Sequence, residues 1–166
     1  MNGREAAPAV RQASVLIAST RAAAGVYEDQ TAPVIRDWLT GHGFETKEAL
    51  VVPDGEPVGA ALRALLLLDP RVVITSGGTG LSHDDLTPEM TAPLLERELP
   101  GIMEAIRAAG RASTPHAALS RGHAGTAGRT FIVNLPGSPR GVMDALAVLD
   151  PIIDHLCDQL EGRHGH

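Results

Sequence analysis

A run of apolar residues that ends in a glycine cluster is the feature of this sequence that most constrains its fold. Residues 72–75 are all β-branched, with no alternation of polar side chains. Such a run is typical of a strand that is buried on both faces of a parallel sheet. Gly77, Gly78 and Gly80 follow it, and glycine permits backbone angles at which successive N–H groups converge on an anion. The stretch therefore predicts either a phosphate-binding loop or a tight turn.

Spacing and composition exclude several classes of protein. The glycine cluster has neither the G-x-G-x-x-G pattern of a dinucleotide-binding loop nor the lysine of a P-loop. A net charge of −6 and an aromatic content of 2% argue against a nucleic-acid partner. No apolar run approaches the ~20 residues that span a bilayer, and the first eight residues lack the pattern of a secretory signal, so we expect no membrane partner and a cytoplasmic location. The single cysteine, Cys157, excludes an internal disulfide and a cysteine-based zinc site, and we expect it to be a small core residue.

Strand and helix patterns alternate through the first half of the chain. Residues 14–19 predict a first strand and residues 44–52 a weaker second one, with a helix between them that begins at Thr31 and ends at Gly41. The next helix has an apolar stripe formed by Val58, Leu62, Leu65 and Leu66. We expect Leu67 and Leu68 to widen this stripe toward a deeply buried end.

Prolines set the limits of the later helices. Thr87 is expected to cap a helix that Pro93 keeps short or bent. A further helix is predicted over residues 100–110. The last helical pattern runs from Val142 to Leu160, and we expect Pro151 to kink it or to split it in two.

One segment indicates antiparallel pairing. Residues 119–124 and 129–134 predict a hairpin around a four-residue turn at 125–128, whereas strands that alternate with helices elsewhere imply a parallel sheet. The predicted fold is therefore α/β, a three-layer α/β/α sandwich with a mostly parallel sheet and one antiparallel hairpin. At 166 residues, we expect one domain over 13–162, a loose N-terminal segment over 1–12 and a loose tail over 163–166.

The predicted topology brings four polar segments to one edge of the sheet. Residues 19–20, Asp54, residues 76–85 and residues 134–138 each follow a strand, and ligands of such sheets bind beyond the carboxyl ends of the strands. Two of these segments are glycine-containing turns that lead into helices, so they offer two anion-binding sets of N–H groups. Arg71 and Arg129 stand at strand starts and are expected at the opposite edge.

The carboxylates of this edge suit a magnesium ion. Asp54, Asp85 and the neighbouring Asp84 are hard oxygen ligands, and Mg²⁺ is commonly held by one or two carboxylates while substrate phosphates complete the octahedron. Asp54 has a structural alternative, because an aspartate in a Pro-Asp-Gly turn can cap the next helix. Asp85 has no evident local role, since Thr87 is expected to serve as the cap.

Other polar residues of the same edge have two interpretations each. Ser138 precedes a proline and can cap a helix or contact a ligand, and Asn134 can bond a turn or read the edge of a ring. His83 would titrate near neutral pH, but a loop histidine is more often simply solvated.

Several motifs, in this order and spacing, resemble the Mog/MoaB family of molybdenum-cofactor biosynthesis proteins. The resemblance runs from about Val15 to Gly162. The motifs that carry it are Ala24-Gly-Val-Tyr-Glu-Asp29, Val51-Val-Pro-Asp54, Ser76-Gly-Gly-Thr-Gly80, Asp85-Leu-Thr-Pro-Glu89, Leu99-Pro-Gly101, Leu119-Ser-Arg121 and Ile132-Val-Asn-Leu-Pro-Gly-Ser-Pro139.

The resemblance implies an α/β/α domain, usually trimeric, that binds molybdopterin and ATP. It implies a Mg²⁺-dependent transfer of AMP to the terminal phosphate of molybdopterin, which gives adenylyl-molybdopterin and pyrophosphate, and a downstream partner that inserts molybdenum. Asp54 and Asp85 match the carboxylates that serve Mg²⁺ and catalysis. The substrate- and nucleotide-binding residues that it implies are Ser76, Gly77, Gly78, Thr79, Gly80, Thr87, Asn134, Pro136, Gly137 and Ser138.

The chain departs from the family pattern at three places. Thr20 stands where many relatives have an aspartate, Thr31-Ala32 replaces a Ser-Gly pair, and Asp84 replaces an arginine. Two alternatives therefore stay open beside the transferase: a non-catalytic molybdopterin-binding paralogue, and a nucleotide-pyrophosphate hydrolase of the related competence-damage type.

Overall fold

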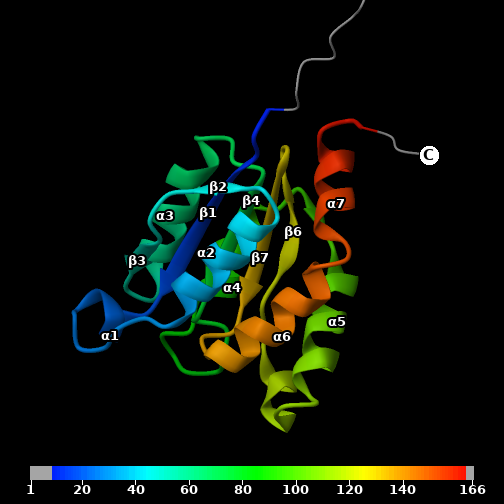
Figure 1. Ribbon diagram of the computed structural model, residues 1–166. Helices are drawn as coiled ribbons and strands as arrows, with labels where there is room; N and C mark the ends of the chain where they lie inside the picture. Colours follow the sequence, from blue (N-terminus) through cyan, green and yellow to red (C-terminus); the bar gives the residue numbers. More distant parts are fainter. Residues whose placement is uncertain (1–8, 164–166) are drawn as a thin grey trace, which may run out of the picture.

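A single mixed sheet forms the centre of the molecule (Figure 1). The computed structural model describes residues 9–163. The strand order is β2-β1-β4-β7-β6-β5, and β3 also pairs with β1. Within it β1 (Gln12–Ala18), β2 (Glu45–Thr46), β3 (Leu50–Val52), β4 (Val72–Ser76) and β7 (Thr130–Leu135) are parallel. The strands β6 (Ala124–Ala127) and β5 (Arg97–Glu98) are antiparallel to their neighbours.

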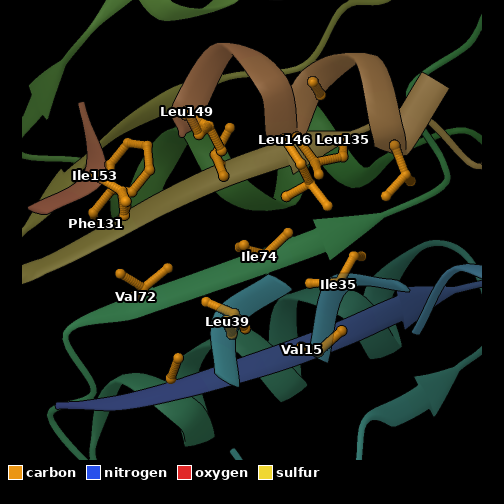
Figure 2. Close-up of a cluster of buried hydrophobic side chains, with 14 of the residues drawn as sticks. Val15, Ile35, Leu39, Val72, Ile74, Phe131, Leu135, Leu146, Leu149 and Ile153 are labelled. Carbon is orange, nitrogen blue, oxygen red and sulfur yellow. The ribbon is translucent and has the colours of Figure 1, made fainter. Parts of the chain in front are cut away.

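Alternate residues of the central strands face two separate apolar layers. Val15 and Ile17 of β1 belong to one buried cluster, while Leu16 and Ala18 belong to the other, as the two-residue period of a strand requires. The larger cluster lies between the sheet and the helices α2 (Thr31–Gly41), α5 (Pro100–Gly110), α6 (Pro139–Leu149) and α7 (Ile153–Leu160), and Figure 2 shows part of it. The smaller cluster lies under α3 (Glu56–Leu66). Helices therefore cover both faces, and the predicted three-layer α/β/α sandwich is confirmed.

Short helical turns complete the chain. They are α1 (Thr20–Ala23), α4 (Thr87–Thr91), and the 3-10 helices η1 (Ala92–Leu94) and η2 (Pro115–Leu119). The predicted split of the last helix is confirmed, because α6 ends at Leu149 and α7 begins at Ile153. Cys157 is fully buried in α7, as predicted. No helix within residues 9–163 has the length and apolar character to cross a membrane.

The expected buried end of α3 is wrong. The side chains of Leu67 and Leu68 are 86% and 67% exposed. The helix ends at Leu66, and the chain then turns through Asp69, which has a φ of 50°, to enter β4. The two leucines therefore lie on the outside of a turn, out of phase with the helical stripe.

The hairpin exists, but its turn is shorter than predicted and it is not the only antiparallel pairing. Gly125 lies within β6 opposite Ile132, and the turn consists of Gly128 and Arg129. A Cβ at Gly125 would lie 2.3 Å from the carbonyl oxygen of Arg97, so this glycine allows the close approach of β5. That strand is too short and too polar to show a periodic pattern.

The predicted domain limits need one correction at the N-terminus. Gln12 already belongs to β1, and Arg11 forms ion pairs with Asp158 and Glu161, so neither lies in a loose segment. Residues 1–8 of that predicted segment and residues 164–166 of the predicted tail lie outside the described residues. The predicted second strand is also two short strands, β2 and β3, rather than one.

Candidate functional site

The carboxyl ends of the central parallel strands lie level with one another. Ser76, the last residue of β4, is opposite Ile17 of β1 and Leu135 of β7. Val52, the last residue of β3, is opposite Ala18. The loops that follow these strands therefore leave the sheet side by side, as the predicted topology required. Arg71 lies at the opposite end, where it donates a hydrogen bond to the carbonyl oxygen of Arg129.

A cavity of about 210 Å³ lies between these loops. Both candidate carboxylates, Asp54 and Asp85, line it together with Ser76, with Gly77 and Gly78 of the glycine cluster, and with Gly137 of the loop after β7. The rest of its wall comes from the end of β1, from the segment after it and from the start of α2, namely Ile17, Ala18, Ser19, Tyr27, Asp29 and Thr31. The structure thus brings the four predicted segments to one place.

Asp54 holds the segment after β1 rather than capping a helix. Its Oδ2 accepts hydrogen bonds from the backbone N–H and the hydroxyl of Thr20, each at 3.1 Å. The cap of α3 is Gly55, without a side-chain hydrogen bond. Within the described residues Oδ1 of Asp54 accepts no side-chain or backbone hydrogen bond, so one oxygen stays free for a ligand.

Asp85 has a local role that the sequence did not reveal. Its Oδ2 accepts a hydrogen bond from the N–H of Ser82 at 3.0 Å, which closes a turn in the loop. We expected Thr87 to cap α4 and Asp85 to have no local role. Both expectations are wrong, because the cap position of α4 is Leu86, which makes no side-chain hydrogen bond. Asp85 therefore positions its own loop and also lines the cavity.

Thr87 instead has a buried hydroxyl without a partner. Its side chain is fully buried, and among residues 9–163 no group forms a hydrogen bond with Oγ1. A buried hydroxyl in this state costs free energy. A Cβ at Gly78 would lie 2.2 Å from this oxygen and 3.1 Å from Asp54 Oδ1. The glycine backbone, the hydroxyl and the carboxylate therefore converge on one spot.

The two glycine-containing loops touch each other. Ser76 Oγ donates a hydrogen bond to the carbonyl oxygen of Pro136 at 2.8 Å, and a Cβ at Gly137 would lie 3.4 Å from Gly77 Cα. Gly77 has a φ of 96°, and a Cβ there would lie 2.3 Å from the carbonyl oxygen of Ala18. Only glycine suits this position. Ser138 caps α6 by accepting a hydrogen bond from Gly141 N–H, which is one of its two predicted roles.

Of the two predicted interpretations of Asn134, the structure favours bonding within the protein, because the side chain lines neither cavity. Its side chain is fully buried. The amide nitrogen donates to the hydroxyls of Thr75 and Thr91, each at 3.0 Å, and the amide oxygen accepts from His123 N–H at 2.9 Å. Both ends of the amide are therefore used within the protein, and the residue bonds neighbouring segments together.

A second cavity, of about 410 Å³, lies on the other side of the two loops, between α5, η2 and α6. Thr79 and Gly80 of one loop and Pro136 and Ser138 of the other line it. Much of its wall comes from α5 and η2. The sequence assigned no binding role to these elements, although Leu119 and Ser120 of the motif at residues 119–121 line the cavity, so sequence reasoning missed it. Asp84 and His83 are exposed and line neither cavity.

The donor set is compatible with a magnesium ion. Each candidate carboxylate has one oxygen without a hydrogen bond from residues 9–163, and a Cβ at Gly80 would lie 2.7 Å from Asp85 Oδ2, so glycine leaves room beside the carboxylate. Within those residues no group of three or more His, Cys, Asp or Glu side chains is placed to hold a metal. Two carboxylates alone suit Mg²⁺, which takes its other ligands from water and substrate phosphates.

Residues of the first cavity outside the predicted set come mainly from the segment after β1. Asp29 bonds the first turn of α2 from the residue before the cap position, because its carboxylate accepts hydrogen bonds from Thr31 N–H and Ala32 N–H. Tyr27 lies near it at the cavity wall and is 41% exposed. Both belong to the motif at residues 24–29. That motif indicated that the segment is important in the family, but it did not show which of its side chains line the cavity.

Comparisons with known proteins agree on one family. Residues 14–155 match the model of a probable molybdopterin binding domain. The molybdenum cofactor biosynthesis bifunctional protein of Synechococcus elongatus is 39% identical over 92% of this chain, which spans only 49% of that relative. The molybdopterin adenylyltransferase of Helicobacter pylori (strain J99) is 33% identical over 90% of this chain and 88% of its own length. The structure of the molybdopterin biosynthesis Mog protein from Mycobacterium ulcerans matches with a TM-score of 0.87 and 51% identity, covering 90% of this chain and 99% of that one.

Proposed function

The chain belongs to the family of probable molybdopterin binding domains, and on that premise we propose that it is a molybdopterin adenylyltransferase. It transfers AMP from ATP to the terminal phosphate of molybdopterin and releases pyrophosphate. The name of the Helicobacter pylori relative, of which this chain spans 88%, supports the reaction. The bifunctional relative has about twice the length of this chain, so the proposal concerns only the activity of this domain.

One observation carries the proposal: two carboxylates and two glycine-containing loops surround the same cavity. Both substrates are anions at their reacting ends. The loop at residues 76–80 offers backbone N–H groups to one phosphate, and the start of α6 after Gly137 and Ser138 offers others to the second. An enzyme that joins two phosphates must hold both against their mutual repulsion.

The reaction itself needs little covalent help. An oxygen of the molybdopterin phosphate attacks the α-phosphorus of ATP, a new P–O bond forms, and the bond to the pyrophosphate oxygen breaks. No proton has to be removed from the nucleophile, because the attacking phosphate is ionised at neutral pH. Catalysis then depends on alignment and on neutralisation of charge.

Asp54 and Asp85 would hold the Mg²⁺ that the family implies. When bound, this ion neutralises charge on the phosphate oxygens. The protein aligns the two carboxylates by different means, since Thr20 fixes Asp54 and the turn at Ser82 fixes Asp85. Thr87 Oγ1 lacks a partner among the described residues. It is fully buried under Gly78 and lines neither cavity, so its donation to a phosphate oxygen requires Gly78 to move when the substrate binds.

The larger cavity suits the ring of one substrate. Its volume of about 410 Å³ lies within the ordinary range of small-molecule sites, and it adjoins both loops that would hold phosphates. Apolar groups such as Ile106, Ala117 and Leu119 line part of it, as stacking of a flat heterocycle requires. We place the pterin or the adenine here.

We propose that the domain works as a homotrimer in the cytoplasm, where ATP is available, and that its product passes to a protein that inserts molybdenum. These features come from the family resemblance. The oligomeric state is the one that a mass measurement on the isolated protein decides.

The test is an assay of pyrophosphate release from ATP with Mg²⁺, with and without molybdopterin, followed by identification of adenylyl-molybdopterin. We expect release only when molybdopterin is present. Asp54→Asn and Asp85→Asn should each lower kcat by about 10²-fold or more, because charge that the transition state needs is lost. Asp84→Asn, an exposed neighbour that lines neither cavity, is the matched control and should keep full activity.

The alternatives give different results in the same assay. Molybdopterin binding without pyrophosphate release would show a non-catalytic paralogue. Hydrolysis of ATP or a dinucleotide without molybdopterin would show a hydrolase. Full activity of both aspartate variants would contradict the roles given to Asp54 and Asp85.

A further inference from the structure

One guanidinium group holds both ends of the loop that carries Asp85. Arg121 lies between η2 and β6, distant in sequence from this loop. Its Nε donates to the carbonyl oxygen of Gly80 at 2.9 Å, and its Nη2 donates to the carbonyl oxygen of Asp85 at 2.7 Å. Its Nη1 pairs with the carboxylate of Glu89 at the start of α4. The side chain thus uses all of its nitrogens on one loop and the helix after it.

Little else holds the tip of this loop. Leu81, Ser82, His83 and Asp84 are exposed, and Leu81 buries only a minor part of its side chain, being 70% exposed. The tip itself contains the turn between Ser82 and Asp85, with hydrogen bonds of 3.0 Å in both directions. That turn fixes the shape of the tip but not its position on the protein. The hydrogen bonds from Arg121 to Gly80 and Asp85 fix that position.

The segment that carries Arg121 is itself anchored to the core. Its backbone N–H donates to the carbonyl oxygen of Thr79, and the N–H of His123 donates to the buried amide of Asn134. A Cβ at Gly122 would lie 2.9 Å from the carbonyl oxygen of Asn134, so the segment packs closely against β7. A continuous set of contacts therefore runs from the core through Asn134 and Arg121 to the loop of Asp85.

We propose that Arg121 is a positioning residue for the adenylyl transfer, which sets the place of the Asp85 carboxylate relative to the glycine cluster. The inference rests on the function proposed above. Arg121 acts through geometry more than through its charge, because Glu89 already neutralises it. The hydrogen bond from Arg121 is the main cause that lowers the pKa of Glu89, so the Glu89 carboxyl is ionised at neutral pH.

Lysine cannot replace this arginine. Its single ammonium group cannot reach two carbonyl oxygens and a carboxylate in the planar arrangement that a guanidinium spans. We therefore expect Arg121→Lys to keep the charge and lose the placement. Misplacement of a catalytic group by about 1 Å can cost on the order of 10²-fold in rate.

The experiment compares Arg121→Lys and Arg121→Ala with Arg36→Lys and Arg36→Ala. Arg36 is a partly buried arginine of α2, distant from this loop, whose guanidinium makes one long contact, 3.5 Å, to Thr46 Oγ1. We expect kcat to fall about 10- to 100-fold in both Arg121 variants, with a change of less than about threefold in KM for ATP. Added guanidinium ion should restore part of kcat in Arg121→Ala and not in Arg121→Lys. The Arg36 variants should keep the wild-type values.

Amide hydrogen exchange at the base of the loop gives a readout that does not depend on turnover. The N–H of residue 121 donates to the carbonyl oxygen of Thr79 and the N–H of Thr87 donates to that of Gly78, so their protection should fall in both Arg121 variants, while β4 and β7 stay protected. Wild-type kcat and protection in Arg121→Lys would overturn the proposal, as would a loss of activity that follows global unfolding. If the wild type itself transfers no AMP, the proposed function fails, whereas the exchange measurement still decides whether Arg121 places the loop.

Discussion

The buried hydroxyl of Thr87 is unusual among the polar groups of this protein. Its neighbour one helical turn later, Thr91, is equally buried, but Thr91 Oγ1 donates to the carbonyl oxygen of Thr87 and accepts from Asn134. Within the described residues, Thr87 Oγ1 has no such partner and lies against Gly78. Two threonines of one helix thus serve different purposes, one for stability and one, as we propose, for a ligand.

Thr87→Val tests this difference. Replacing an unsatisfied hydroxyl by a methyl group should raise the free energy of unfolding by about 1 kcal/mol, while the Kd for ATP with Mg²⁺ should rise about tenfold because a hydrogen bond to a charged phosphate is lost. Thr91→Val, the matched control, should lower stability by about 1–3 kcal/mol. Urea denaturation and titration calorimetry measure both quantities. Equal destabilisation by the two variants would contradict the assignment.

At the scale of elements, the carboxylate of Glu161 joins the last helix to the starts of two strands. Its Oε1 accepts from Nε and Nη2 of Arg11 at 3.0 and 2.7 Å, and its Oε2 accepts from Arg71 Nε at 3.3 Å. Only 11% of its side chain is exposed. Burial acts to raise the pKa of Glu161, but the hydrogen bond and charge of Arg11, with Arg71, outweigh it, so the pKa is lowered.

Glu161→Gln should therefore lower the free energy of unfolding by about 1–2 kcal/mol at pH 7. A carboxylate whose pKa is lower in the folded state contributes stability above its unfolded value and loses it as the pH falls through the folded value. The difference between wild type and variant should thus shrink below about pH 4.5. Glu104→Gln, an exposed position of α5, is the control. A difference that stays constant from pH 7 to pH 3 would disprove the ionic origin.

The sequence predicted the elements that depend on continuous or periodic apolar residues. The strands β4 and β7 are fully buried and β1 is buried from Val15 to Ala18, and their parallel arrangement brought Asp54 and Asp85 to one edge as expected. The errors concern contacts between segments that are distant in sequence. The strand β5 consists of two polar residues, and it can pair with β6 because Gly125 has no side chain in its way. No local pattern shows that the side chain of Asn134 is buried or that Arg121 reaches the loop of Asp85.

At the scale of the whole molecule, an apolar groove of about 470 Å³ runs between the first turns of α5 and the end of α6 with the residue before α7. Its wall consists of small and aliphatic residues, namely Leu99, Pro100, Gly101, Ile102, Ala105, Val148 and Ile152. None of its lining residues belongs to the loops at the carboxyl ends of the parallel strands. This surface suits the contact between copies in the proposed trimer.

Light scattering should give three times the 17.3 kDa mass of one chain. Ala105→Glu puts a charge at an exposed position of the groove and should yield folded monomers, because burial of an unpaired carboxylate in an interface is costly. Ala60→Glu, an exposed position of α3 on the other face of the sheet, should leave the mass unchanged. A monomer mass for the wild type would end the trimer proposal, and a trimeric Ala105→Glu would place the contact elsewhere.

The burial of Cys157 has a practical consequence for studying the loop of Asp85. Burial is the main cause that raises the pKa of this thiol to about 12, so at neutral pH only on the order of 10⁻⁵ of it is the reactive thiolate. It is the single cysteine of the chain. A cysteine introduced at the exposed Leu81 would therefore be the one site that a fluorescent or spin label modifies in the folded protein, and the label would report directly on the motion of the loop during turnover.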